Sequence, residues 1–432
     1  MKNYKYIGLF LASLAITSCD VNNDLDEIPA NLPAEVELNT TGLDFSKYVS
    51  IGASFTAGFT DNALFIAAQE NSFPNILAEK FGTSFNQPMM NDNIGGLLFA
   101  GNVIQGPRLF FNGSGPAPLA ATPTTEVTAK VTGALHNFGI PGAKSFHLVA
   151  PGYGNPAGVP LGLANPYFAR MSTSANATVL GDAMAQAPTF FTLSEVGGND
   201  VLGYALSGGS GVNQTGNLNP ATYGSSDITD PNVFASVFSN MVTTLTSGGA
   251  KGVVATVPYI TNLAHFTTVP HNPVPLDAGT AAAVNGAYAP YNAGIQQAFG
   301  ALVQLGLMPQ AVAAAEIAKR TISFSAGAGN AVVIVDEDLT DLGAINPAFA
   351  ALPQYRQATA ADLLVLPSST FIGTTVGGNP QLINGVTVPL ADRWVITPQE
   401  QTAIKTATDA YNTTIAAVAA ANPNVALVDF KA

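Results

Sequence analysis

The feature that most constrains this chain is the alternation of short β-rich runs with long helical patterns along its 432 residues. The predicted strands lie at 48–51, 135–138, 190–196, 252–257 and 425–430, with a further one at 332–335. The predicted helices lie at 63–81, 233–247, 281–305 and 398–421. Strands that alternate with helices of this length favour a parallel sheet whose strands are joined by crossover helices.

The helix at 398–421 has the clearest start signal. Thr397 is a suitable N-cap residue, Pro398 occupies the first helical position, and Glu400 lies in the first turn. Between the predicted elements, long stretches rich in Gly, Pro, Asn and Ser indicate insertions at about 86–128, 207–231 and 305–395. Insertions of this length crowd one rim of a parallel sheet.

The N-terminus resembles an export signal that ends in a lipid attachment site. Lys2 and Lys5 precede an apolar run at 7–16 that is too short to span a bilayer, and the run leads into a lipobox-like segment that ends at Cys19. We therefore expect a signal peptide at 1–18, a lipidated flexible tether at 19–33, and a domain at 34–432. Lipid on Cys19 would anchor that domain to a membrane of the cell envelope, at the outer membrane or the cell surface. The alternative is an ordinary signal peptide with a leftover cysteine.

Composition and missing motifs argue against several classes of function. Charged residues make up only 10%, and the formal net charge of −13 argues against a nucleic-acid partner. Cys19 is the only cysteine, which excludes internal disulfides and cysteine metal clusters. A partial calcium-loop pattern at 20–31 fails because Leu25 stands where a glycine is needed and Asn31 where a bidentate carboxylate is needed. With no zinc, nucleotide or dinucleotide motif either, we expect no metal and no cofactor.

Three segments place reactive or polar groups at the ends of predicted strands. Ser54 follows the first strand on a turn that contains Gly52, Gly142 lies in the loop after the second strand, and Asn199 follows paired glycines after the third. Ligands usually bind at the carboxyl edge of a parallel sheet. A serine there can act as a nucleophile, while backbone N–H groups and an amide can stabilise an oxyanion. Each segment alone is also typical of ordinary turns.

In this order, the three segments resemble those of the SGNH (GDSL-like) hydrolase family, and the match extends from about residue 47 to the end, including a strand end at 256–258. The resemblance implies a three-layer α/β/α sandwich with a central parallel sheet and large loop insertions. It also implies that Ser54 is the nucleophile. The oxyanion hole would then consist of the Ser54 and Gly142 N–H groups and the Asn199 side chain.

The chain departs from the family pattern at two places. Ala53 replaces an aspartate that is not catalytic, and the Asp-x-x-His block that supplies the general base in the family is absent. We therefore expect the domain to be C-terminally incomplete at residue 432. The alternative base is His265, on the loop after the fourth strand, although a loop or surface histidine is the simpler interpretation. His136 and His147 are interpreted as packing or surface residues.

The resemblance therefore implies a serine ester hydrolase, either an esterase or a lipase, that works through an acyl-enzyme on Ser54. Its substrate would be an ester of a small molecule, an acylated glycan or a lipid. The alternative is a non-catalytic surface lipoprotein that binds glycan or lipid on a degenerate hydrolase scaffold. The missing histidine block motivates this second interpretation.

Overall fold

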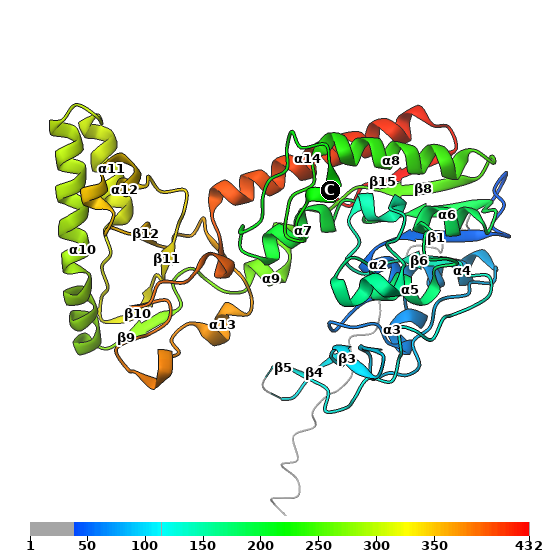
Figure 1. The fold of residues 1–432 in the computed structure, drawn as a ribbon, viewed down its shortest axis with the longest axis horizontal. Helices are drawn as coiled ribbons and strands as arrows, with labels where there is room; N and C mark the ends of the chain where they lie inside the picture. Colours follow the sequence, from blue (N-terminus) through cyan, green and yellow to red (C-terminus); the bar gives the residue numbers. More distant parts are fainter. Residues whose placement is uncertain (1–38, 114, 432) are drawn as a thin grey trace, which may run out of the picture. The chain divides into compact units, whose positions relative to one another are not determined.

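A five-stranded sheet in which every neighbouring pair is parallel forms the centre of the fold (Figure 1). Its strands, in spatial order, are β15 (Val425–Val428), β8 (Lys251–Ala255), β7 (Phe190–Leu193), β1 (Tyr48–Gly52) and β6 (Asn137–Gly139). The computed structural model describes residues 39–431 apart from residue 114. The predicted signal peptide, Cys19 and the tether at 19–33 therefore lie outside the described residues. The predicted mixed α/β class with a parallel central sheet is confirmed.

Both faces of the sheet are covered by helices. Tyr48 is in register with Phe190, and Val49 with Phe191, so each pair presents its side chains to one face. The rings of Tyr48 and Phe190 pack against Phe81 of helix α4 (Phe73–Phe81). Val49 and Phe191 instead join a buried cluster with helices α8 (Pro231–Thr246) and α14 (Pro398–Ala421). This arrangement is compatible with an α/β sandwich.

The remaining helices around the sheet are short. They are α2 (Ser54–Ala57), α3 (Ile66–Glu70), α5 (Pro166–Met171), α6 (Val179–Met184) and α7 (Asn199–Leu206), with 3₁₀ helices η1 (Ser145–Val149), η2 (Pro156–Leu161), η3 (Pro220–Thr222) and η4 (Ile260–Asn262). The longer α14 begins as predicted. The Thr397 hydroxyl accepts from the Glu400 N–H at 3.3 Å, and the Glu400 carboxylate accepts from the Thr397 N–H at 2.6 Å.

The single helix predicted at 63–81 is wrong, because two helices, α3 and α4, occupy this segment. Pro74 has no N–H to donate to the Glu70 carbonyl, so a continuous helix would lose a bond there. The Asn75 side chain donates to that carbonyl instead, at 2.8 Å. Ser72 takes an extended conformation, and α4 restarts after it.

Two predicted strands depart from those observed in ways that affect the sheet or the site. The strand predicted at 190–196 ends at Leu193, because Glu195 has φ 53° and Gly197 has φ 107°, which turn the chain out of the sheet. The extra strand predicted at 332–335 is observed as β11 (Val333–Val335). It pairs antiparallel with β12 (Tyr355–Gln357) and does not join the central sheet.

The segment from α9 to β14 contains three further small sheets, each of two strands. Its elements are α9 (Ala264–Thr267), β9 (Val274–Leu276), α10 (Ala278–Gln304), α11 (Gln310–Arg320), β10 (Gly327–Asn330), β11, α12 (Leu342–Ile345), η5 (Pro347–Phe349), β12, β13 (Leu363–Leu364), α13 (Ser368–Phe371), η6 (Val376–Gly378), η7 (Asp392–Trp394) and β14 (Val395–Ile396). A separate buried cluster extends from Val269 to Val395. Its core therefore begins before residue 305, where the predicted insertion starts.

The predicted insertion at 86–128 is not purely irregular. It holds two short antiparallel pairs, β2 (Leu97–Phe99) with β3 (Asn102–Gln105), and β4 (Leu109–Phe111) with β5 (Pro116–Pro118). No helix among the described residues is long and apolar enough to cross a membrane.

Candidate active site

Ser54 lies at the carboxyl end of β1, in the turn that leads into α2. Gly52 ends the strand, Ala53 precedes the helix, and Ser54 is its first residue. A Cβ on Gly52 would lie 2.1 Å from the Thr56 hydroxyl and 2.7 Å from the Ser194 carbonyl oxygen, so the turn closes this tightly only with glycine. The Ser54 side chain remains partly exposed. This is the position that the sequence predicts for a nucleophile.

The partly buried carboxylate of Glu195 hydrogen-bonds to the backbone of this turn. Glu195 Oε1 accepts from the backbone N–H groups of Ala53 (2.7 Å) and Thr56 (2.8 Å), and Oε2 accepts from that of Phe55 (2.9 Å). Burial raises the pKa of Glu195, while these three hydrogen bonds act in the opposite direction by stabilising the carboxylate. Within residues 39–431 the Ser54 N–H donates to no acceptor. It is therefore available to a bound oxyanion.

The loop that carries Gly142 is tied to the start of α7. Asn199 donates one amide hydrogen to the Ala143 carbonyl at 2.9 Å, which leaves the second amide hydrogen unused. The next residue, Asp200, is fully buried and accepts from the Ser145 N–H (2.8 Å) and hydroxyl (2.7 Å). Gly142 has φ 78°, a left-handed conformation that favours glycine. The Asn199 side chain thus contacts the loop that contains Gly142.

Ser54 and Asn199 line the same pocket. Its volume is about 470 Å³, and Glu195 and Ser194 contribute to its wall. Most of the remaining lining is apolar and includes Phe55, Phe73, Leu202, Ile260, Leu263 and Phe430. Phe55 is 72% exposed and Phe430 53% exposed, so two aromatic rings border the open side. Gly142 is not among the lining residues.

No histidine is found among the residues that line this pocket, all of which belong to the described chain. His265 lies on α9, two residues beyond the lining residue Leu263, and its ring contacts Phe266. Burial lowers the pKa of His265. His136 accepts at Nδ1 from the Asn86 N–H, which fits a packing role.

The sequence interpretation assigned no role to Glu195. The available signal was an acidic residue directly after a buried strand and before paired glycines, a position where a charged side chain is unusual. Its partners lie about 140 residues earlier in the chain, so no local pattern points to them.

Comparison with protein-family models, with curated proteins and with solved structures finds no match to this chain.

Proposed function

We propose that this chain is a serine ester hydrolase of the SGNH type, built as a three-layer α/β/α sandwich, with Ser54 as its nucleophile. One observation carries the proposal. Ser54 sits on a tight strand-to-helix turn at the carboxyl edge of the parallel sheet and lines a 470 Å³ pocket together with Asn199. An exposed hydroxyl on a rigid turn, beside a pocket for substrate, is what nucleophilic catalysis requires.

The proposed oxyanion hole is supported by unused donors. Among the described residues, neither the Ser54 N–H nor the Gly142 N–H donates to a protein acceptor, and Asn199 keeps one amide hydrogen. The hydrogen bond from Asn199 to Ala143 keeps the Gly142 loop close to α7, which suits a joint role in binding one oxygen.

In the proposed reaction, Ser54 Oγ bonds to the ester carbonyl carbon and its proton passes to a base. The bond to the alcohol oxygen then breaks, and the alcohol leaves with a proton. Water next attacks the acyl-enzyme, which releases the carboxylic acid and restores Ser54. The apolar lining around Leu202, Ile260 and Leu263 suits an acyl chain, so we propose esters with an apolar acyl group as substrates. His265 remains the proposed substitute for the family's base.

A second candidate function is a surface lipoprotein that binds glycan or lipid without turnover. The absence of a histidine among the pocket residues of the described chain favours it, because a serine hydroxyl needs a neighbouring base at neutral pH. Both candidates place the ligand in the same pocket.

Membrane attachment through Cys19 is part of both proposals. Radiolabelled palmitate should be incorporated into the wild-type protein and not into Cys19→Ser expressed in the same host. Equal incorporation into both proteins would overturn the lipidation proposal.

The decisive experiment treats the full-length protein with a fluorophosphonate probe and locates the adduct by mass spectrometry. We expect an adduct on Ser54 and none in Ser54→Ala. Ser194→Ala is the matched control, because Ser194 lines the same pocket and the variant should label like wild type. Asn199→Ala should lower kcat/KM for p-nitrophenyl esters by about 100-fold or more, the typical cost of losing one oxyanion donor.

The outcomes separate the two candidates. No adduct on Ser54 in a folded protein, with no hydrolysis of any ester, would overturn the hydrolase proposal. Fatty-acid or glycan binding that is retained in Ser54→Ala, without turnover in wild type, would favour the binding protein.

A further inference from the structure

Three carboxylates from separate elements converge beside the start of α14. One oxygen from each of Glu337, Asp392 and Glu400 lies within 4.8 Å of the other two. Glu337 follows β11, Asp392 begins η7, and Glu400 lies in the first turn of α14. Glu337 is exposed, Asp392 is partly buried and Glu400 is buried, so the cluster reaches solvent at Glu337.

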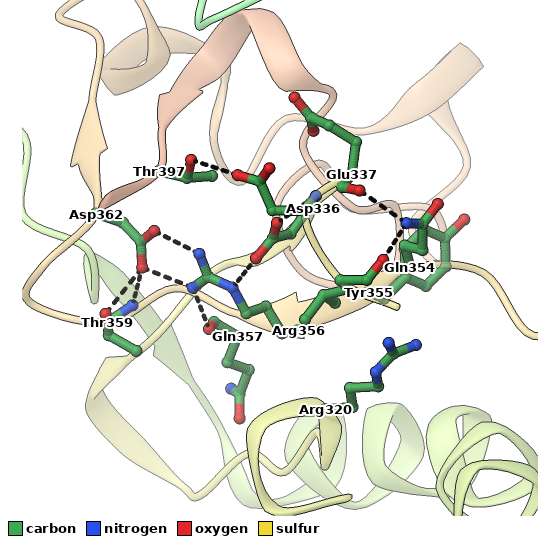
Figure 2. A network of polar contacts seen from close by, with 12 residues as sticks. Arg320, Asp336, Glu337, Gln354, Tyr355, Arg356, Gln357, Thr359, Asp362 and Thr397 are labelled. Carbon is green, nitrogen blue, oxygen red and sulfur yellow. Dashed lines mark hydrogen bonds and ion pairs between the residues drawn. The ribbon is translucent and has the colours of Figure 1, made fainter. Parts of the chain in front are cut away.

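No cation compensates this charge within the described chain. None of the three carboxylates forms an ion pair within the described residues. In contrast, Asp336, which precedes Glu337 in the chain, pairs with Arg356. Figure 2 shows Asp336 beside the Arg356 guanidinium and the Glu337 carboxylate directed away from it. Neighbouring carboxylates at this spacing repel each other strongly when they are partly withdrawn from water.

A buried oxygen that lacks a partner points to a ligand at this place. Glu400 is only 5% exposed; Oε2 accepts from the Thr397 N–H, but Oε1 is buried and has no hydrogen-bond partner among residues 39–113 and 115–431. Asp392 Oδ1 is likewise buried and unpartnered. Native structures rarely leave such a buried acceptor unsatisfied, because its lost hydrogen bonds to water are not replaced.

We propose that Glu337, Asp392 and Glu400 bind a calcium ion. An all-oxygen, all-carboxylate ligand set without histidine or cysteine is selective for a hard cation. Ligand oxygens at about 2.3–2.6 Å from Ca²⁺ can lie up to about 5 Å apart, which matches the observed spacing. Glu337 is exposed, so water can complete the coordination shell on that side. The proposal is independent of the ester hydrolase proposal.

The calcium ion would also stabilise the segment that follows α7. A Cβ on Gly209 would lie 1.6 Å from Glu400 Oε1, and one on Gly208 would lie 2.1 Å from the Asp392 carbonyl oxygen. The two glycines therefore pack directly against the ligands. Helix α7, whose first residue is Asn199, ends just before them. Bound calcium would hold η7, α14 and the end of α7 in fixed positions relative to one another.

The first test is thermal unfolding of the chelator-treated protein with and without 5 mM CaCl₂ (about 50-fold above a dissociation constant of about 10⁻⁴ M), at matched ionic strength. We expect the Tm of wild type to rise by about 3 °C, as such an excess predicts for a chain of this size. Glu337→Gln should lose this shift, and its exposed position makes misfolding unlikely to confuse the result. The matched control is Glu70→Gln, the same chemical change at an exposed carboxylate outside the cluster, which should keep the full shift.

The stability of a cluster variant in chelator, without calcium, provides a second test. In chelator, Asp392→Asn should be at least as stable as wild type, because it removes repulsion, yet it should gain nothing from calcium. Mg²⁺ should give a smaller shift than Ca²⁺, since it needs a tighter octahedral shell and holds its water. An equal shift with both ions would overturn the assignment to calcium.

Terbium luminescence provides a measurement that needs no variant. Trp394 is the only tryptophan of the chain and lies two residues from Asp392, so Tb³⁺ in the site should be sensitised by indole excitation. We expect calcium to displace this signal. The proposal is overturned if wild type shows neither a calcium-dependent Tm nor a calcium-displaceable terbium signal, or if Glu337→Gln responds to calcium as wild type does.

Discussion

The carboxylate of Glu195 holds the turn that begins at Ser54. Its two oxygens accept from the backbone N–H groups on both sides of Ser54, at 2.7–2.9 Å, while the Ser54 N–H itself donates to no acceptor in the part of the chain that the structure describes. A carboxylate at the start of a helix is favourably placed with respect to the N–H groups that have no partner within the helix. The position of the proposed nucleophile thus depends on a residue 141 positions later in the chain.

We predict that Glu195→Gln slows fluorophosphonate labelling of Ser54 by about tenfold or more. The amide keeps one acceptor oxygen and turns an NH₂ group toward the remaining N–H donors, so the turn loosens. The free energy of unfolding should fall by about 2 kcal/mol, as expected for losing hydrogen bonds to a charged group. Labelling kinetics and urea unfolding measure the two effects. Unchanged labelling in a folded variant would contradict the positioning role of Glu195.

Gly52→Ala should destabilise the protein by about 2 kcal/mol or more. The added Cβ would lie 2.1 Å from the Thr56 hydroxyl and 2.7 Å from a backbone oxygen, so the turn must shift. Gly286→Ala, inside α10, is the matched control. A Cβ at Gly286 would meet no atom within 4 Å, and alanine favours a helix by about 1 kcal/mol over glycine. Urea unfolding should therefore give opposite signs for the two variants, and equal signs would refute this account.

Arg356→Met should cost about 3–5 kcal/mol of stability. Arg356 donates to Asp336 and Asp362, which are both fully buried, so its removal leaves two uncompensated carboxylates (Figure 2). Lys405→Met breaks an ion pair of 2.5 Å with Asp409 in which the side chains are 61% and 40% exposed, and should cost less than about 1 kcal/mol. Chemical denaturation of both variants tests the comparison. Similar losses of stability in the two variants would show that burial does not determine how much these ion pairs stabilise the protein.

His147 should make stability fall in mildly acidic solution. Burial, with a contribution from the positive charge of Lys144, lowers the pKa of His147 from 6.5 to about 4. The native state therefore resists protonation while the unfolded chain accepts the proton. Stability from this group is complete above pH 6.5 and decreases as the pH falls toward 4, by up to about 3 kcal/mol.

The measurement compares wild type with His147→Gln in urea at pH 7 and at pH 4.5. The difference in stability between the two proteins should shift in favour of the variant at the lower pH. The ring of His147 stacks on Tyr153 at 4.4 Å, so the variant loses some packing at both pH values. A difference that does not change with pH would contradict the assigned pKa.

Local signals in the sequence predicted local structure well. Thr397 caps α14 and Pro398 begins it as expected, and Glu400 completes a capping box, because all these partners lie within one helical turn. The short β-rich runs predicted all five strands of the central sheet, although β6 begins two residues later than expected. Where a turn interrupts a run, as at Glu195, the sequence pattern overestimated the strand, since hydrophobicity does not report a positive φ.

The geometry of the two proposed sites depends on contacts between segments that are far apart in the sequence. The sequence placed Ser54, Gly142 and Asn199 at strand ends, and parallel pairing of the sheet explains why Ser54 and Asn199 share a pocket. Only the tertiary structure brought the Glu195 carboxylate under the Ser54 turn and gathered Glu337, Asp392 and Glu400 within 4.8 Å. Periodicity and capping act over a few residues, whereas these contacts join segments that are separate in sequence, and their geometry arises only when the whole core has packed.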